Sequence, residues 1–249
     1  MNEGAMWTKA TTSVKQNRLL ALLPEEELVS IKSRAERVRL RPRQILHHWR
    51  SPLEHVYFLT DGLVSVGGNV GENEYVEAWL IGSEGAVGAI LLLTGRAQAA
   101  PHRRVVQVGG SALRLSAPDF LELADRLPTF RQVLHRYLAV VMVQTSQAGV
   151  CNAVHSVKQR LARWLLVASQ GLDSHDLPLT HDVLSRLLGV RRASVTECLS
   201  ELEDQGVIST HRGHIEITNP DLLRQTSCAC FQLIHREYVR QLTSVGRCL

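Results

Sequence analysis

Two arginines, Arg191 and Arg192, stand directly after a glycine and a valine in the stretch LLGVRRASVTECLSEL, residues 187–202. Long cationic side chains at the beginning of a helix can bind phosphates and guanine edges, because the free N–H groups there also favour anions. Three acids, Glu201, Glu203 and Asp204, lie toward the other end of the same stretch. We therefore expect a helix whose first turns meet a polyanion and whose last turns point away from it.

The residues around these arginines predict the elements that would position them. Thr180 is of the type that caps a helix, and Gly189 can take the positive φ of a tight turn. The apolar residues between them lie at helical spacing: Val183, Leu184, Leu187 and Leu188. The same holds after the turn for Val195, Cys198, Leu199 and Leu202. This pattern predicts a helix-turn-helix, and VISTHRGHIEI, with Arg212-Gly213 at its centre, predicts the two strands of a wing.

The first half of the chain has a different pattern. Residues 18–34 predict a helix, and the segments after it carry short β-rich runs separated by glycines. Asp61-Gly62 inside HVYFLTDGLVSVGG predicts a hairpin, and EYVEAWLIG, RRVVQVGG and SALRLS predict further short strands. Many short strands at close spacing are typical of a compact barrel or roll.

A long helical segment follows the strands. Residues 127–151 fit heptads with an apolar seam that Gln144 interrupts. The seam residues are Leu127, Phe130, Leu134, Tyr137, Val141, Gln144 and Ala148. Because the helix is long for a domain of this size, we predict that it pairs with the same helix of a second copy. The alternative is a helix buried against its own domain.

Composition limits the class of protein. The 249 residues are 45% hydrophobic and 21% charged with a net charge of +4, which allows a buried core and permits a polyanionic partner. The longest apolar run, YLAVVMV, is too short to span a bilayer, and the first residues lack the apolar region of a signal peptide. We expect a cytoplasmic protein with no membrane partner.

The five cysteines are Cys151, Cys198, Cys228, Cys230 and Cys248. They are odd in number and lack the paired spacing of zinc sites, so we expect reduced thiols and no metal site. A metal or redox element at CAC, residues 228–230, is the alternative. HRGH, residues 211–214, fits a wing contact, since two histidines alone leave a zinc shell incomplete.

An enzyme is one rival function. GSEGAVG is glycine-rich but lacks the spacing of a dinucleotide fingerprint, and no Walker lysine follows it. We therefore expect a protein that is not an enzyme. A second rival is a signalling module that uses the predicted roll as a ligand sensor and does not bind DNA.

At residues 18–218 the chain resembles the Crp/Fnr family of bacterial transcription regulators. EHVYFLTDGLVSV resembles the sensor hairpin of the family, and SVKQRLARWLL resembles the helix that opens its DNA-binding domain. LTHDVLSRLLGVRRASVTECLSELEDQGVI resembles its helix-turn-helix most closely. The resemblance implies an α+β fold with an N-terminal cyclic-nucleotide-binding-like β-roll, a long dimerisation helix and a C-terminal winged helix-turn-helix.

The corresponding expected domains are a flexible leader (1–17), a sensor domain (18–120), a dimerisation helix (121–152) and a winged DNA-binding domain with a C-terminal tail (153–249). The expected partners are double-stranded DNA, a second copy of the chain and, for an activator, RNA polymerase. The sequence leaves open the effector, the operator and the choice between activation and repression.

The resemblance also implies which residues meet DNA. The positions that read base edges in the family are occupied here by Arg192, Ala193, Ser194 and Glu197. Positions that touch phosphate are occupied by Thr180, His181 and Arg191, and Arg212 stands at the wing. Well-known members carry glutamate in place of Ala193 and arginine in place of Glu197, so the operator of this chain is expected to differ from theirs. We expect Arg192 to read guanine.

The effector site is less determined. Gly88 matches a glycine of the cyclic-nucleotide-binding members, but Ala89 replaces the glutamate that holds the ribose. His102, Arg103 and Arg104 stand near the family's arginine position with a register ambiguous by one, and they could bind an anion. Thr145 and Ser146 match positions of the dimerisation helix that touch the nucleotide base.

The sensor could bind one of three groups: a cyclic nucleotide, an iron–sulfur cluster or haem. A cyclic nucleotide fits only part of the family pattern, so the effector stays unknown. The absence of an N-terminal cysteine cluster in the sequence argues against an iron–sulfur cluster. Haem stays open, because four histidines lie in the sensor region: His47, His48, His55 and His102.

Overall fold

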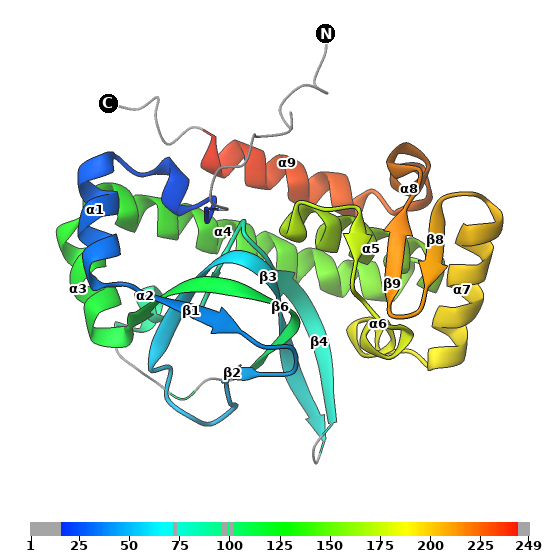
Figure 1. The fold of residues 1–249 in the computed structure, drawn as a ribbon, viewed down its shortest axis with the longest axis horizontal. Coiled ribbons are helices and arrows are strands. Elements are labelled where there is room, and N and C mark those ends of the chain that lie inside the picture. Colours follow the sequence, from blue (N-terminus) through cyan, green and yellow to red (C-terminus); the bar gives the residue numbers. More distant parts are fainter. Residues whose placement is uncertain (1–15, 72–73, 96–98, 100–101, 244–249) are drawn as a thin grey trace, which may run out of the picture.

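The computed structural model describes residues 16–71, 74–95, 99 and 102–243. Figure 1 shows a β-roll on one side, a winged helical domain on the other, and a long helix behind both. This mixture of helices and sheets is the α+β class expected from the sequence. Within these residues, no helix is both long and apolar enough to span a membrane.

The chain is anchored at residue 17, where the sequence suggested a flexible leader. Residues 1–15 lie outside the described residues. Asn17 is fully buried, and its amide donates to the carbonyls of Leu59 (3.0 Å) and Gly85 (2.8 Å). Its side-chain oxygen accepts from Leu19 N–H (3.0 Å) and Leu20 N–H (3.2 Å), just before the short 3-10 helix Leu20–Leu22. Asn17 is therefore part of the folded roll.

Every strand pair of the roll is antiparallel, in the order β1-β6-β3-β4, with β2 also on β6 and β5 on β3. The strands are β1 (Glu36–Leu40), β2 (Ile45–His47), β3 (His55–Gly71), β4 (Glu74–Ile81), β5 (Ala86–Val87) and β6 (Arg103–Ser116). Aliphatic side chains from β1, β3 and β6, among them Leu40, Val64 and Val106, form a cluster that closes the roll.

The hairpin predicted at Asp61-Gly62 is wrong. β3 continues through these residues because both of its halves pair with β6, Phe58 opposite Leu113 and Val66 opposite Arg104. The ladder carries bulges there, and Gly62 has a φ of 90° that a larger residue would resist. The paired strand β6 likewise continues through its glycines at 109–110. The two short strands predicted over 103–116 are therefore a single strand. The glycines bend a continuous ladder and do not reverse the chain.

Helices close one end of the roll: α1 (Glu25–Arg34), α2 (Leu91–Thr94) and α3 (Ala117–Arg126). The hydroxyl of Ser116 caps α3 by accepting from Asp119 N–H. Phe58 of the sheet, Phe120 of α3 and Phe130 form an aromatic cluster with ring centroids 5.8–5.9 Å apart. This cluster ties the sheet to the beginning of the long helix.

The dimerisation helix predicted over 121–152 is two helices. α3 ends at Arg126, and the long helix α4 (Pro128–Val154) begins at a proline, a residue that can start a helix but lacks the N–H to continue one. The predicted seam lies against its own chain. Phe130, Leu134, Tyr137 and Ala148 are buried, and Leu127 and Val141 pack on the same core. An apolar stripe needs a cover, and the core of the roll covers its residues up to Val141, whereas Gln144 is half-buried outside that core.

The winged domain consists of α5 (Val157–Leu172), β7 (Asp176–Leu177), α6 (His181–Leu188), α7 (Arg192–Asp204), β8 (Ile208–His211), β9 (His214–Ile217) and α8 (Pro220–Thr226). A capping box of Ser156 and Gln159 starts α5. The three strands pair in the order β7-β9-β8. Their apolar faces and those of the helices share one core.

The C-terminal segment forms a further helix, α9 (Cys230–Leu242), which lies along α4 (Figure 1). Leu242 is buried in the core of the roll, and Tyr238 Oη donates to the carbonyl of Glu84 (3.0 Å). Residues 244–249 of the predicted tail lie outside the described residues. α9 therefore covers a second side of α4 and touches the roll.

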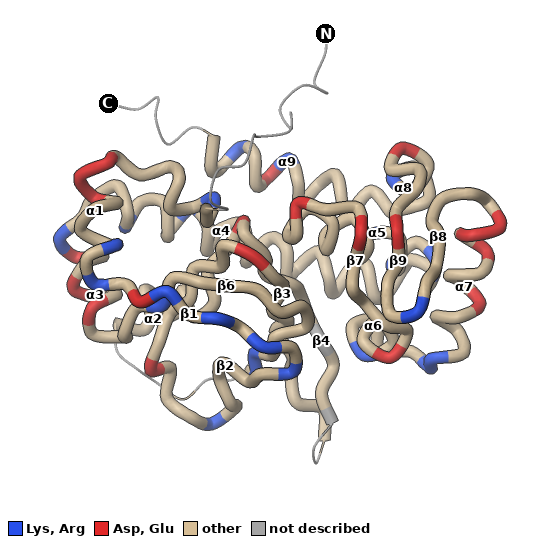
Figure 2. The backbone as a smooth tube through the Cα atoms, in the orientation of Figure 1, with Lys and Arg blue, Asp and Glu red and all other residues tan. Residues whose placement is uncertain are grey.

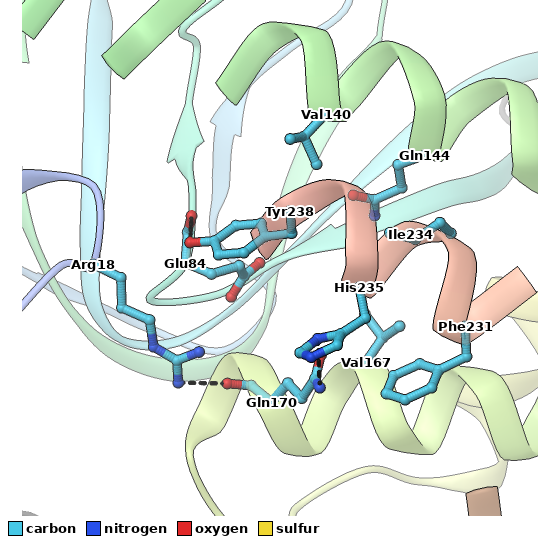
Figure 3. A pocket seen from close by; sticks show the side chains of 10 residues that line it. All are labelled: Arg18, Glu84, Val140, Gln144, Val167, Gln170, Phe231, Ile234, His235 and Tyr238. Carbon is cyan, nitrogen blue, oxygen red and sulfur yellow. Dashed lines mark hydrogen bonds between the residues drawn. The ribbon is translucent and has the colours of Figure 1, made fainter. Parts of the chain in front are cut away.

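The roll and the winged domain are closely joined. Ser83 N–H donates to the carbonyl of Gly171 (3.1 Å), and Arg18 donates to the carbonyl of Gln170 (2.8 Å). Figure 3 shows Arg18, Glu84, Gln170 and Tyr238 around a cavity of about 60 Å³ at this junction. Burial raises the pKa of the Glu84 carboxyl there. The roll and the winged domain are therefore in direct contact at this junction.

Candidate DNA-binding interface

The helix-turn-helix has the predicted local geometry. The hydroxyl of Thr180 accepts from Val183 N–H (3.2 Å) at the start of α6. Gly189 has a φ of 63°, in the left-handed region. Its N–H donates to the carbonyl of Arg186 (3.3 Å), and Val190 N–H donates to that of Ser185 (3.1 Å), so the last turn of α6 is closed. The cap and the glycine turn are both confirmed.

α7 presents one face to the core and one to solvent. Val195, Leu199 and Leu202 are buried, as the spacing predicts. Among residues 192–200, the exposed ones are Arg192, Ala193, Thr196, Glu197 and Ser200, and Ser194 is half-buried. Arg191, the residue before the helix, is exposed as well. The expected base-reading positions thus lie on one accessible surface, with Ser194 at its edge.

Thr196 belongs to this surface but was not among the residues selected from the sequence. Its hydroxyl donates to the carbonyl of Arg192 (3.1 Å) and lies 2.9 Å from Nδ1 of His181. The contact joins the start of α6 to the exposed face of α7. The signal that could have found Thr196 is its position one turn after Arg192.

The wing is held against α7. Gly213 turns the chain with a φ of 83°, and His211 lies opposite His214 across the turn that exposes Arg212. The carboxylate of Glu203 accepts from Thr210 N–H and from the Thr210 hydroxyl, both at 2.7 Å. These bonds lower the pKa of Glu203. The wing is therefore hydrogen-bonded directly to α7.

The charges of α7 oppose its helix dipole. Figure 2 shows cations at the end of the helix near α6 and acids at the other end. A cation near the N-terminus or an acid near the C-terminus of a helix costs about 0.3–1 kcal/mol. Within the described residues Arg191 and Arg192 form no ion pair, whereas Glu201 pairs with Lys158 (3.0 Å) of α5. The arrangement does not serve the stability of the helix and favours contact with an anion.

The sensor residues divide between the inside and the outside of the roll. Gly88 has a φ of 94°, and a Cβ there would lie 2.9 Å from the carbonyl oxygen of His55. Ala89 is buried. Arg104 points inward and is buried, while the guanidinium of Arg103 lies 4.0 Å from the ring centre of Tyr75. The alternation of the strand thus selects Arg104 as the inner arginine.

The two remaining groups of sensor candidates are placed differently. His102 is half-buried, and its ring meets Trp79 edge-on at 6.0 Å. The Thr145 hydroxyl donates within α4, to the carbonyls of Val141 and Met142 (both 2.9 Å), and Ser146 is exposed. The two hydroxyl residues therefore do not form a polar pocket with each other.

The inside of the roll holds a cation without a matching anion. Arg104 donates to the carbonyl of His102 (3.2 Å) and pairs with no carboxylate in the described part of the chain. Burial lowers the pKa of Arg104 to about 10, which leaves it charged at neutral pH. Burial and Arg104 lower the pKa of His47 to about 3, so His47 is neutral. Nδ1 of His47 and Nε1 of Trp79 are buried without a hydrogen-bond partner.

Three cysteines and a histidine meet at the other end of α4. The ligand atoms of Cys151, His155, Cys228 and Cys230 all lie within 4.8 Å of one another. The sequence did not reveal this group, because Cys151 and Cys228 are 77 residues apart. The cysteine spacing that argued against a metal site is therefore not decisive. Cys198 lies elsewhere, on α7, and Cys248 lies outside the described residues.

Comparison with known proteins agrees with this geometry. Residues 159–226 match the Crp-like helix-turn-helix domain family. The chain is 28% identical to the global nitrogen regulator of Synechococcus elongatus, over 70% of this chain and 82% of the relative. It is 24% identical to that of a Nostoc species, over 68% of this chain and 79% of the relative.

Solved structures share the fold. FixK2 from Bradyrhizobium japonicum superposes with a TM-score of 0.67 at 16% identity, over 78% of this chain and 98% of that one. The c-di-GMP-responsive regulator CLP of Xanthomonas campestris gives a TM-score of 0.63 at 16% identity, over 78% and 99%. The rival interpretation, a signalling module that does not bind DNA, is disfavoured by the Crp-like domain. This chain is a DNA-binding transcription regulator of the Crp/Fnr type.

Proposed function

We propose that the protein binds an inverted repeat in double-stranded DNA as a homodimer, with α7 of each copy in the major groove. The observation that carries this proposal is the exposed face of α7, where Arg191 and Arg192 are exposed at the start of the helix and the acids lie at the far end. A groove-bound helix needs such a face at its N-terminal turns. The same geometry explains why the charges oppose the helix dipole.

Each exposed side chain of the interface has a role by its chemistry. Arg192 donates to guanine O6 and N7, and the Ala193 methyl contacts thymine. Glu197 accepts from a cytosine amine, and Ser194 donates at the edge of the face. The phosphate contacts come from Thr180, His181, Arg191 and Arg212. Thr196 orients His181 through its 2.9 Å contact.

Selection of bound sequences from random duplexes, followed by variant binding, tests the base-reading role. Arg192→Ala is expected to weaken the selected duplex by about 1–3 kcal/mol, the value of a bidentate guanine contact, and random DNA much less. Arg224→Ala, an exposed arginine on α8, is the matched control and leaves both affinities unchanged. Equal losses on selected and random DNA would show that Arg192 contacts only phosphate.

The dimer needs a face of α4 that the protomer leaves open. The seam residues from Leu127 to Val141 pack on the core of the roll, and α9 covers a second side. The third side carries residues at alternating spacings of four and three: His135, Ala139, Met142, Ser146, Gly149 and Ala153. All are exposed except the half-buried Ala139. Met142 (66%), Val150 (52%) and Val154 (68%) are apolar side chains left largely in solvent on this part of the helix.

We therefore move the proposed dimer seam from the predicted residues to this third side. Heptad spacing with small residues lets two helices approach closely. Met142→Arg is expected to raise the dimer dissociation constant at least about tenfold, since it places two cations in the seam. Sedimentation of the purified variant measures it, with Val29→Arg on α1, where the valine is 55% exposed, as the control. A Met142→Arg variant that dimerises like the wild type would exclude this seam.

The effector that we propose is a small anion inside the roll. The support is the buried Arg104 without a carboxylate, beside two buried ring nitrogens that lack partners. A buried cation is costly unless it is paired, and acceptor oxygens of an anion would satisfy both Arg104 and the Trp79 N–H. Nε2 of neutral His47 donates to the carbonyl of His55 (2.7 Å), so its Nδ1 is an acceptor and would take a hydroxyl of the ligand. A cyclic nucleotide is one such anion, although Ala89 cannot hold a ribose hydroxyl. In this proposal Thr145 and Ser146 respond to the ligand through a shift of α4, and Ser146 lies on the dimer seam.

The remaining parts of the mechanism follow from the dimer. The effector shifts the two α4 helices between arrangements that do or do not present the α7 pair one turn of DNA apart. RNA polymerase is the further partner if the protein activates transcription. A protein acting on DNA in this way works in the cytoplasm.

A further inference from the structure

A cluster of three thiols and an imidazole lies where α4 ends. Cys151 and His155 lie one turn apart at the end of α4. Cys230 is the first residue of α9, and Cys228 lies two residues before it. All three cysteines are buried and His155 is half-buried. Four donor atoms of the kinds that bind zinc thus converge from two ends of the winged domain.

The distances already resemble the edges of a tetrahedron. Sγ of Cys151 lies 3.5 Å from Sγ of Cys228, and Sγ of Cys230 lies 3.6 Å from Nδ1 of His155. Zinc bonds of about 2.3 Å to sulfur and about 2.0 Å to nitrogen place tetrahedral ligand atoms about 3.6–3.8 Å apart. Shifts of a few tenths of an ångström along these two edges would fit a zinc ion.

The surroundings suit a metal–thiolate group. Gln147 Nε2 donates to Sγ of Cys230 (3.1 Å), as the second layer of a metal site does. Arg160 lies close enough to Cys151 and Cys228 for their charges to interact, and its buried Nε has no hydrogen-bond partner. Three thiolates around Zn²⁺ carry one net negative charge. The guanidinium of Arg160 would balance that charge.

We propose that Cys151, His155, Cys228 and Cys230 bind one Zn²⁺ ion in a structural Cys₃His site. Thiolate and imidazole ligands select zinc over calcium and magnesium. Four protein ligands fill the tetrahedron, so the site is closed to substrate. Binding releases the thiol protons to solvent.

The site lies where α4 meets both ends of the winged domain. The chain enters α5 directly after His155 and leaves the winged domain at Cys228, so the zinc ion fixes both ends of that domain to α4. Arg160 also donates to the carbonyl of Leu188, the last residue of α6 before the glycine turn. The zinc clamp therefore sets the angle at which each copy presents α7.

Metal content of the purified full-length chain tests the proposal directly. After dialysis under reducing conditions, we expect about one zinc per chain, as for a site with four protein ligands. Cys151→Ser and Cys228→Ser should each lose most of it. The matched control is the double variant Cys198→Ser/Cys248→Ser, which keeps the cluster and should retain the zinc. His155→Ala, at a half-buried position, should fold and hold zinc more weakly.

Cobalt supplies a readout that does not depend on the variants folding. Co²⁺ added to the metal-free wild type should give thiolate-to-cobalt absorption that zinc then abolishes. Any of three results overturns the proposal: no zinc and no cobalt absorption in the wild type, zinc retained in Cys228→Ser, or a Cys151–Cys228 disulfide without metal.

DNA binding tests the clamp separately from the metal. Removal of zinc from the wild type is expected to weaken the selected duplex about tenfold, or about 1.4 kcal/mol. Unchanged affinity would overturn the clamp while leaving the metal site in place. Loss of all DNA binding by the zinc-loaded protein would instead contradict the proposed function.

Discussion

The arginines at the two ends of this molecule are in opposite environments. Arg191 and Arg192 are exposed at the start of α7, whereas Arg104 is buried inside the roll. An exposed cation at a helix N-terminus costs about 0.3–1 kcal/mol, and a buried one without a partner costs several kcal/mol. The exposed pair suits a long polyanion that can be met at the surface. The buried arginine suits one small anion that replaces its lost water.

Salt concentration should separate the two regions most strongly. Raising it from about 50 to about 200 mM is expected to lower DNA affinity about 10³–10⁵-fold if the dimer contacts six to ten phosphates. Fluorescence anisotropy of a labelled duplex over a salt series measures the slope. Binding of a small anion at Arg104 should change far less, because buried charges are poorly screened. A DNA affinity that does not change with salt would contradict the assignment of the exposed arginines to phosphate contacts.

Replacing the buried arginine should stabilise the protein. Arg104→Met keeps the volume and removes the uncompensated charge, so the free energy of unfolding is expected to rise by about 1–4 kcal/mol. Urea unfolding of the ligand-free protein measures this, and the variant should no longer be stabilised by anions. Arg103→Met is the control, and it should lose about 0.5–1 kcal/mol with its contact to Tyr75. A strongly destabilised Arg104→Met would mean that Arg104 has a partner.

Acid should weaken the roll through His47. Its pKa is lowered to about 3 in the folded chain by burial first and by Arg104 second, and it is about 6.5 when unfolded. Between these values the unfolded chain binds more protons, so stability is lost as pH falls below 6.5. From pH 7 to pH 5 the loss is about 2 kcal/mol. Urea unfolding at both pH values should show it in the wild type and in His48→Gln, and less of it in His47→Gln.

Short-range patterns gave the most accurate predictions. The Thr180 cap, the Gly189 turn and the buried row of α7 depend on contacts within one or two helical turns, so the residue types specify them. Most of the exposed face of α7 followed from the same spacing. Thr196 was missed, since its contact with His181 crosses between two helices.

Longer-range pairing overturned the predicted hairpin and placed most of the predicted dimer seam against the roll. Asp61-Gly62 fits a hairpin by residue type, but both flanks of the pair are held by the same strand β6, as in the distant pairs Phe58–Leu113 and Val66–Arg104. The heptads of α4 correctly indicated a covered helix face. They could not say whether the roll or a second copy covers it, because an apolar stripe is satisfied by either.

The sequence by itself determined the helix-turn-helix, the wing and the charge gradient of α7, since each is written in residues that are neighbours along the chain. Only the tertiary structure decided that Arg104 faces inward, that α4 keeps a third side open, and that Cys151 meets Cys228. Those facts depend on how distant segments pack. Packing is set by the shape and burial of the whole core, which no local pattern contains.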